Sequence, residues 1–289
     1  MAGELRIYLN RTPDTKDVIL STDSTCRRLS KSYKRTFPFS LATTSFIYPD
    51  TYAKNVEMLG PYVDEIELLM FESDPAGLPS ASDIHHLETL AREFDLVYNV
   101  HLPYDVSLAD SDQGKRYRAI DAVRRVMDLT APLCPTTYTL HLPYDDPNNS
   151  TDTVQAWQDR CMDGVARLLS PGGKPSGISV ETLDYPFEWF RPVIETLGLS
   201  VCLDVGHLML YEMDLAEALK RYKDRTAILH IHGVKNGRDH LALNQADSRP
   251  QMDILKTFLP RFKGTVSIEV FSYPHLAESL PVLKHLLAF

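Results

Sequence analysis

The sequence contains one eight-residue stretch twice, as YNVHLPYD at 98–105 and as YTLHLPYD at 138–145. Six of the eight positions are identical, which chance rarely gives. Matching residues lie 40 positions apart, a suitable length for one strand, one helix and their loops. Each copy begins as a short apolar run, which is typical of a buried strand. We therefore expect two successive strands that end in the same chemical group and point it the same way.

Similar apolar runs recur along the chain, and amphipathic stretches separate them. The runs have the composition of buried parallel strands, and the stretches repeat apolar residues at helical spacing. Eight such units predict a single (β/α)8 barrel, the TIM-barrel fold, from residue 37 to 289. The expected strands are 39–46, 63–71, 96–102, 136–142, 177–183, 199–205, 227–234 and 265–271. The expected helices are 52–60, 84–94, 117–133, 154–169, 214–224, 252–262 and 275–289.

Residues 1–36 differ from the remainder of the chain. They are rich in Ser, Thr, Arg, Lys and Asp, and basic residues gather between Arg27 and Arg35. We expect an N-terminal extension that is a solvated arm or a short capping element. A flap that contacts an anionic substrate is the alternative.

Composition narrows the class of protein. The chain of 289 residues is 44% hydrophobic and 24% charged, which is close to the globular norm and excludes a largely disordered chain. A net charge of −9 disfavours a non-specific nucleic-acid binder. The four cysteines are widely spaced, the N-terminus lacks a signal-peptide pattern, and no apolar run approaches the roughly 20 residues of a membrane span. We expect a cytoplasmic protein with reduced thiols and no membrane partner.

The expected strand ends share one chemistry, that of imidazole and carboxylate. In a barrel of this kind, the functional site lies at the C-terminal ends of the strands. So many acids and imidazoles at one rim would bury like charges close together, which costs free energy. Bound divalent cations would remove that cost. This donor set predicts two or three ions of Zn, Mn or Fe(II). The candidate ligands are His101, His141, Glu181, Asp204, His207, His230, His240 and Glu269, with Asp239 and His232 as possible additions.

Two kinds of reaction suit such a cluster. Two neighbouring ions can hold a phosphoryl group and lower the pKa of a bound water to about 7, which gives a phosphodiesterase. A single ion can instead polarise a sugar while Glu181 and Glu269 move protons, which gives an isomerase or epimerase. In either case we expect Glu181, Glu269 and Asp204 to be catalytic.

The series of strand ends resembles the xylose-isomerase-like barrel superfamily that includes endonuclease IV. The spacing of Asp204 and His207 matches its D-x-x-H motif, whereas NGRDHLAL (236–243) departs from the repair-enzyme spacing, in which one residue separates acid and histidine. The resemblance implies three ion sites. The first would take His101, His141 and Glu181, the second Glu181, Asp204, His230 and Glu269, and the third His207 and His240, with Asp239 in question.

A closer resemblance covers nearly the whole chain from Phe37. The segments FPFSLATTSFIYPD (37–50), VDEIELLMFES (63–73) and YNVHLPYD (98–105) look like the cobamide-remodelling phosphodiesterases. That family hydrolyses the phosphodiester of a corrinoid's nucleotide loop, giving cobinamide phosphate and a lower-ligand riboside. The resemblance implies a cobamide as the small-molecule substrate.

Several further residues are candidates for contact with such a substrate. Hydroxyls end the first strand, two tyrosines follow the repeated histidines, and a lysine follows the seventh strand: Thr43, Thr44, Ser45, Tyr104, Tyr144 and Lys235. Three readings stay open beside the phosphodiesterase. They are a single-metal sugar isomerase or epimerase, an endonuclease IV-like repair enzyme, which the acidic charge disfavours, and a corrinoid-binding protein without catalysis.

Overall fold

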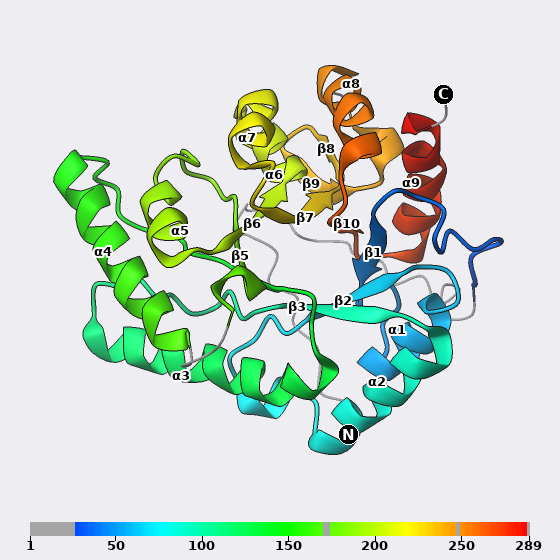
Figure 1. The fold of residues 1–289 in the computed structure, drawn as a ribbon, viewed down its shortest axis with the longest axis horizontal. Coiled ribbons are helices and arrows are strands. Elements are labelled where there is room, and N and C mark those ends of the chain that lie inside the picture. The colour runs from blue at the N-terminus through cyan, green and yellow to red at the C-terminus, as the bar shows by residue number, and fades with distance from the viewer. Residues whose placement is uncertain (1–26, 170–173, 247–248, 288–289) are drawn as a thin grey trace.

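The computed structural model describes residues 27–169, 174–246 and 249–287. Its centre is a closed barrel of eight parallel strands in the order β1-β10-β7-β6-β5-β4-β3-β2, and helices surround the strands (Figure 1). The predicted (β/α)8 fold is therefore confirmed. The barrel strands are β1 (Ser40–Thr44), β2 (Glu65–Leu69), β3 (Val97–His101), β4 (Tyr138–Leu140), β5 (Ile178–Glu181), β6 (Ser200–Asp204), β7 (Thr226–Ile231) and β10 (Thr265–Ile268).

The helices that the sequence pattern predicts begin within a few residues of the expected positions, usually at a polar cap, whereas α5 and α6 were not predicted. Ser80 and Asp83 form a reciprocal capping box at the start of α2, and Asp112 and Ser150 cap α3 and α4. The α-helices are α1 (Tyr52–Leu59), α2 (Ala81–Phe94), α3 (Gln113–Thr130), α4 (Thr151–Leu168), α5 (Arg191–Leu197), α6 (Val205–Leu210), α7 (Leu215–Tyr222), α8 (Arg249–Phe258) and α9 (Tyr273–Leu286). Short 3-10 helices are η1 (Pro75–Gly77), η2 (Ala131–Leu133), η3 (Pro175–Gly177), η4 (Leu243–Gln245) and η5 (Leu259–Arg261).

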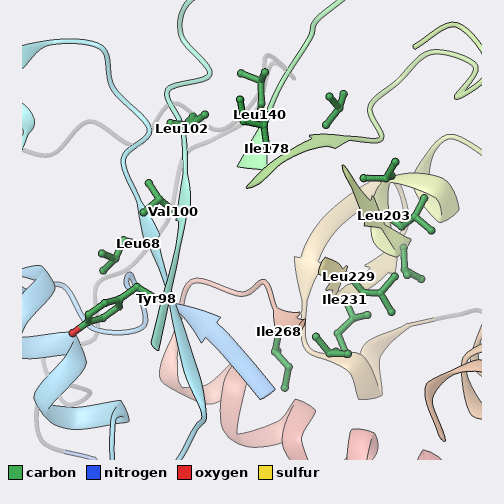
Figure 2. Packing of buried hydrophobic residues seen from close by; sticks show 14 of the residues in the cluster. Leu68, Tyr98, Val100, Leu102, Leu140, Ile178, Leu203, Leu229, Ile231 and Ile268 are labelled. Carbon is green, nitrogen blue, oxygen red and sulfur yellow. The ribbon is translucent and has the colours of Figure 1, made fainter. Parts of the chain in front are cut away.

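The apolar core lies between the strands and the helices, while the barrel interior is polar. Figure 2 shows part of the core, including Leu68, Val100 and Ile268, all of them fully buried. The alternate residues of the same strands face inward. Among these inward residues, Glu67 is paired in register with Asn99. The side chains of both are fully buried. The barrel is thus lined with polar groups that lead up to its C-terminal end.

A two-stranded hairpin follows β7, where the sequence predicts one strand over 227–234. The chain leaves the barrel at Ile231 and continues as β8 (Gly233–Lys235) and β9 (Arg238–Leu241), which pair antiparallel. The turn uses Asn236 and Gly237 with φ of 53° and 71°, the conformation that favours an Asn-Gly pair in a two-residue hairpin loop. The hairpin carries Asp239 and His240 back over the barrel mouth.

The described part of the N-terminal extension packs against the barrel. Leu29 and Tyr33 are buried. Lys34 donates hydrogen bonds to the carbonyls of Gly60 and Phe94, at the C-terminal ends of α1 and α2. These contacts lie at the end of the barrel opposite the predicted site. The positive charge of Lys34 there interacts favourably with the negative ends of the two helix dipoles. Residues 1–26 of the predicted arm lie outside the described residues, so the domain boundary at residue 36 stays a prediction.

Within the described ranges, no helix is both long and apolar enough to cross a membrane.

Candidate metal centre

The C-terminal ends of the barrel strands bring the predicted residues together. Their potential ligand atoms form groups, three of which share Glu181, and within each group all atoms lie within 4.8 Å of one another. Every predicted ligand except Asp239 belongs to at least one group. The groups are His101, His141 and Glu181; Glu181, Asp204, His230 and Glu269; His207, His232 and His240; and Glu181, Cys202 and His230.

Glu181 joins the first group to the second. Its Oε2 lies 2.9 Å from Nε2 of His141 and 3.3 Å from Nε2 of His101. Its Oε1 lies 3.6 Å from Nδ1 of His230. The two oxygens of one carboxylate therefore face different sets of imidazoles, which is the arrangement required of a ligand shared by two ions.

Main-chain carbonyls fix the orientation of three of the histidines. Nδ1 of His101 donates to the carbonyl of Leu102 at 2.9 Å, and Nδ1 of His207 donates to that of Thr182 at 3.1 Å. His240 donates in the same way to the carbonyl of Glu269 at 3.1 Å. Each ring then keeps its Nε2 lone pair, because a neutral imidazole carries a single proton. This support by a hydrogen bond to the second nitrogen is usual for metal-binding histidines.

His230 is held by a carboxylate that the sequence analysis missed. Glu67, fully buried on β2, accepts a hydrogen bond from Nε2 of His230 at 2.9 Å and another from the hydroxyl of Ser267 at 2.7 Å. The signal in the sequence was an acid within a strand expected to be buried on both faces. A buried carboxylate at such a position needs a partner.

Two buried atoms of the second group lack hydrogen-bond partners. They are Nδ1 of His230 and Oε2 of Glu269, which lie 3.1 Å apart. Because Glu67 holds the other nitrogen of His230, its Nδ1 is the atom left to meet an ion. Orphaned polar atoms at this depth are costly, and a divalent cation would satisfy both.

The ionisation of the cluster also suits a cation site. Burial would raise the pKa of the Glu181 carboxyl, but His141 and His230 hold that pKa well below its usual range. Asp204 shows the same balance, with His207 holding its pKa low against burial. Burial opposes protonation of His207, yet Asp204 and Glu181 raise its pKa to about 9. The proton on His207 thus balances the neighbouring acids, and divalent ions can take its place.

One cysteine stands beside the cluster. Cys202 stands near Glu181 and His230, but burial raises the pKa of its thiol well above the usual range. The remaining donors are imidazole and carboxylate, which fit Zn, Mn or Fe(II).

The remaining predicted residues lie around this cluster. Asp239 Oδ2 is 3.9 Å from Nε2 of His240. The hydroxyls of Thr43 and Thr44 donate to main-chain carbonyls of β10 and its loop, and Ser45 accepts from the amide of Leu69. The other three lie at or beyond the mouth: Tyr104, whose ring is 6.0 Å from that of His141; Tyr144, which donates to the carbonyl of Asn148; and exposed Lys235 on β8. Their substrate contacts stay predictions.

Comparison with known proteins places the chain within a family. Residues 56–288 match the family described as xylose isomerase-like TIM barrel. A D-tagatose 3-epimerase-like protein superposes with a TM-score of 0.70 at 17% identity, covering 86% of this chain and 97% of its own. The IolI protein with a bound zinc atom superposes with a TM-score of 0.65 at 16% identity, covering 86% of this chain and 96% of its own. An AP endonuclease of family 2 from Brucella melitensis superposes with a TM-score of 0.63 at 12% identity, covering 86% of this chain and 98% of its own. No curated protein matches the chain. From the extent of the family match, the chain belongs to the xylose isomerase-like TIM-barrel family.

Proposed function

We propose that this protein is a metal-dependent phosphodiesterase whose site holds at least two divalent ions that share Glu181. The observation that supports it is the pair His101 and His141, whose Nε2 atoms face one oxygen of Glu181 while the other oxygen faces His230. A site for a single ion needs only the second group. The extra pair therefore favours chemistry in which two ions act on one phosphoryl group.

The chain's own residues then have distinct tasks in hydrolysis. The ions, when bound, would supply a water of lowered pKa and neutralise the phosphoryl oxygens. Glu181, Asp204 and Glu269 place fixed negative charge around that position. In the reaction the water oxygen bonds to phosphorus, the bond from phosphorus to the riboside oxygen breaks, and a proton passes from the water to that leaving oxygen.

We further propose a cobamide as the substrate, on the resemblance of the chain to the cobamide-remodelling enzymes. The mouth offers support, because a group of partly exposed aromatic rings stands beside the histidines. Phe71 is 4.8 Å from the ring of His101 and 5.0 Å from that of Tyr104, and Phe271 is 4.7 Å from His240. An apolar rim of this kind suits a bulky ring system better than a small polyol.

The direct test is to incubate metal-loaded protein with a panel of cobamides under reducing conditions and to identify the products by mass. We expect cobinamide phosphate and the lower-ligand riboside. Turnover of another phosphodiester with the cobamides intact would overturn the substrate assignment. The Glu181→Ala variant should lose turnover by at least about 100-fold while its circular dichroism stays unchanged. Undiminished turnover in this variant would place the active site elsewhere.

A sugar epimerase is the second candidate. Glu181, Asp204, His230 and Glu269 alone would serve a single ion, and two of the carboxylates could exchange protons with a sugar. The D-tagatose 3-epimerase-like structure shares the fold. Epimerisation of ketohexoses by protein with one ion per chain would favour this function over hydrolysis. An endonuclease is less favoured, because the net charge is −9; retention on a DNA column at about 150 mM salt would revive it.

A further inference from the structure

His232 is held differently from His101, His207 and His240. His232 is buried, and its Nε2 lies 3.2 Å from Oδ1 and 3.4 Å from Oδ2 of Asp204. Its Nδ1 accepts a hydrogen bond from the main-chain N–H of His240 at 3.0 Å. In His101, His207 and His240 the Nδ1 atom faces a carbonyl oxygen instead. Nδ1 therefore meets an N–H donor at His232 and a carbonyl acceptor at those three rings.

This difference fixes the tautomer of His232. A main-chain N–H can only donate, so Nδ1 of His232 must present its lone pair. The proton of the neutral ring then sits on Nε2, where it points at the carboxylate of Asp204. With one nitrogen accepting and the other donating, the ring has no lone pair left for an ion.

Local structure is built around this ring. Gly206 lies against it, and a Cβ at that position would come within 1.9 Å of Cε1 of His232, so no other residue fits without moving the ring. His240 adopts a φ of 50°, an uncommon conformation for a residue other than glycine. The β8–β9 hairpin brings that residue's amide to Nδ1. Two separate elements, α6 and the hairpin, thus fix one side chain.

Asp204 is therefore held from two sides. Its Oδ1 accepts the main-chain N–H of His207 at 2.7 Å, and the Nε2 proton of His232 points at the carboxylate, 3.2 Å from Oδ1 and 3.4 Å from Oδ2. Its Oδ2 lies 3.7 Å from the unpaired Nδ1 of His230. These donors fix the orientation of the carboxylate beside the second group.

We infer that His232 is a positioning residue that donates to Asp204 and fixes the orientation of that carboxylate toward the ion of the second group, and is not itself a ligand. The inference rests on the metal centre of the proposed function but is independent of the substrate. It also leaves the third group with His207 and His240 as its imidazole ligands, so that any ion there is held by fewer donors.

Metal binding tests the inference without any turnover. We would measure ions per chain after dialysis, the affinity of the ion held by Asp204, and the visible spectrum of the Co²⁺-loaded protein. His232→Gln keeps an N–H donor and a carbonyl acceptor, so we expect the ion content and the Co²⁺ spectrum of the unaltered protein. His232→Ala should weaken the Asp204 ion by 10- to 100-fold, as loss of such supporting groups commonly does. His207→Ala, the matched removal of a ligand, should lose an ion outright and change the spectrum.

A second variant keeps the test valid if His232→Ala does not fold. Gly206→Ala removes no polar group but displaces the ring of His232. We expect it to weaken the same ion within the same 10- to 100-fold range. His85→Ala, at an exposed histidine on α2, is the control and should bind metal as the unaltered protein does. The inference is overturned if His232→Gln loses an ion as His207→Ala does, or if Gly206→Ala binds metal with unaltered affinity. A phosphodiesterase assay that fails would leave these readouts intact.

Discussion

At the scale of single residues, Glu67 illustrates how a buried acid acts through its neighbour. It accepts from Nε2 of His230 and so leaves Nδ1 to the ion. We predict that Glu67→Gln weakens metal binding by about 10- to 100-fold, because an amide oxygen accepts less strongly than a carboxylate. Metal titration of the purified variant would measure this.

The matched control for that prediction lies two residues away on the same strand. Glu65 is equally buried but accepts from Asn99, Thr136 and Thr265 and contacts no histidine of the cluster. Burial raises its pKa, so a neutral Glu65→Gln side chain is a mild change. Its metal affinity should stay within about twofold of the unaltered protein, since groups this far from the ions rarely couple. Equal weakening in both variants would show that Glu67 has no special relation to His230.

The raised pKa of His207 predicts how the metal-free protein responds to pH. Asp204 and Glu181, acting against burial, raise this pKa to about 9 from an ordinary value of 6.5. The protonated ring therefore stabilises the fold fully below pH 6.5, and that contribution is lost as pH rises through 9. Melting curves in chelating buffer should show Tm falling across this window.

Two further melts test the cause of that fall. With saturating metal the decline should shrink, because ions replace the imidazole protons and bind more tightly as pH rises. In His207→Asn the metal-free decline should be smaller. A decline of the same size in this variant would exclude His207 as its source.

At the scale of elements, close packing at one glycine sets the position of α4. A Cβ on Gly164 would lie 2.7 Å from the carbonyl oxygen of Leu108. Overpacking of this kind costs about 1–3 kcal/mol and exceeds the gain of about 1 kcal/mol from alanine in a helix. Gly164→Ala should therefore lower Tm, by about 2–4 °C for each kcal/mol lost. Gly177→Ala, where no atom lies within 4 Å, should change Tm little; equal effects of the two substitutions would contradict this account.

The elements also show what the sequence could and could not predict. The strand ends could be predicted because each short apolar run ends in a polar or charged residue, as at His101 and Glu181. The sequence pattern does not predict the hairpin after β7, although Asn236-Gly237 is a strong turn signal, because the apolar run 227–234 reads as one continuous strand. Glu67 was missed because a buried acid and its partner on β7 are distant in sequence. The hydrogen bond from His240 to His232 depends on one backbone dihedral and leaves no sequence pattern.

At the scale of the whole molecule, the barrel concentrates ionisable side chains in its interior and at its C-terminal mouth. The chain is acidic, with a net charge of −9, yet its C-terminal mouth concentrates histidines around a few buried carboxylates. The interior of the barrel continues this polarity through Glu67 and Asn99. The apolar core between strands and helices provides the stability that lets such a polar interior persist.

The central claim is that Glu181 is shared by two ions. The most direct measurement is the number of tightly bound divalent ions per chain after metal loading and dialysis. The account predicts at least two in the unaltered protein, and one fewer when His101 and His141 are both replaced by alanine. A single ion per chain, retained in full by that double variant, would contradict it.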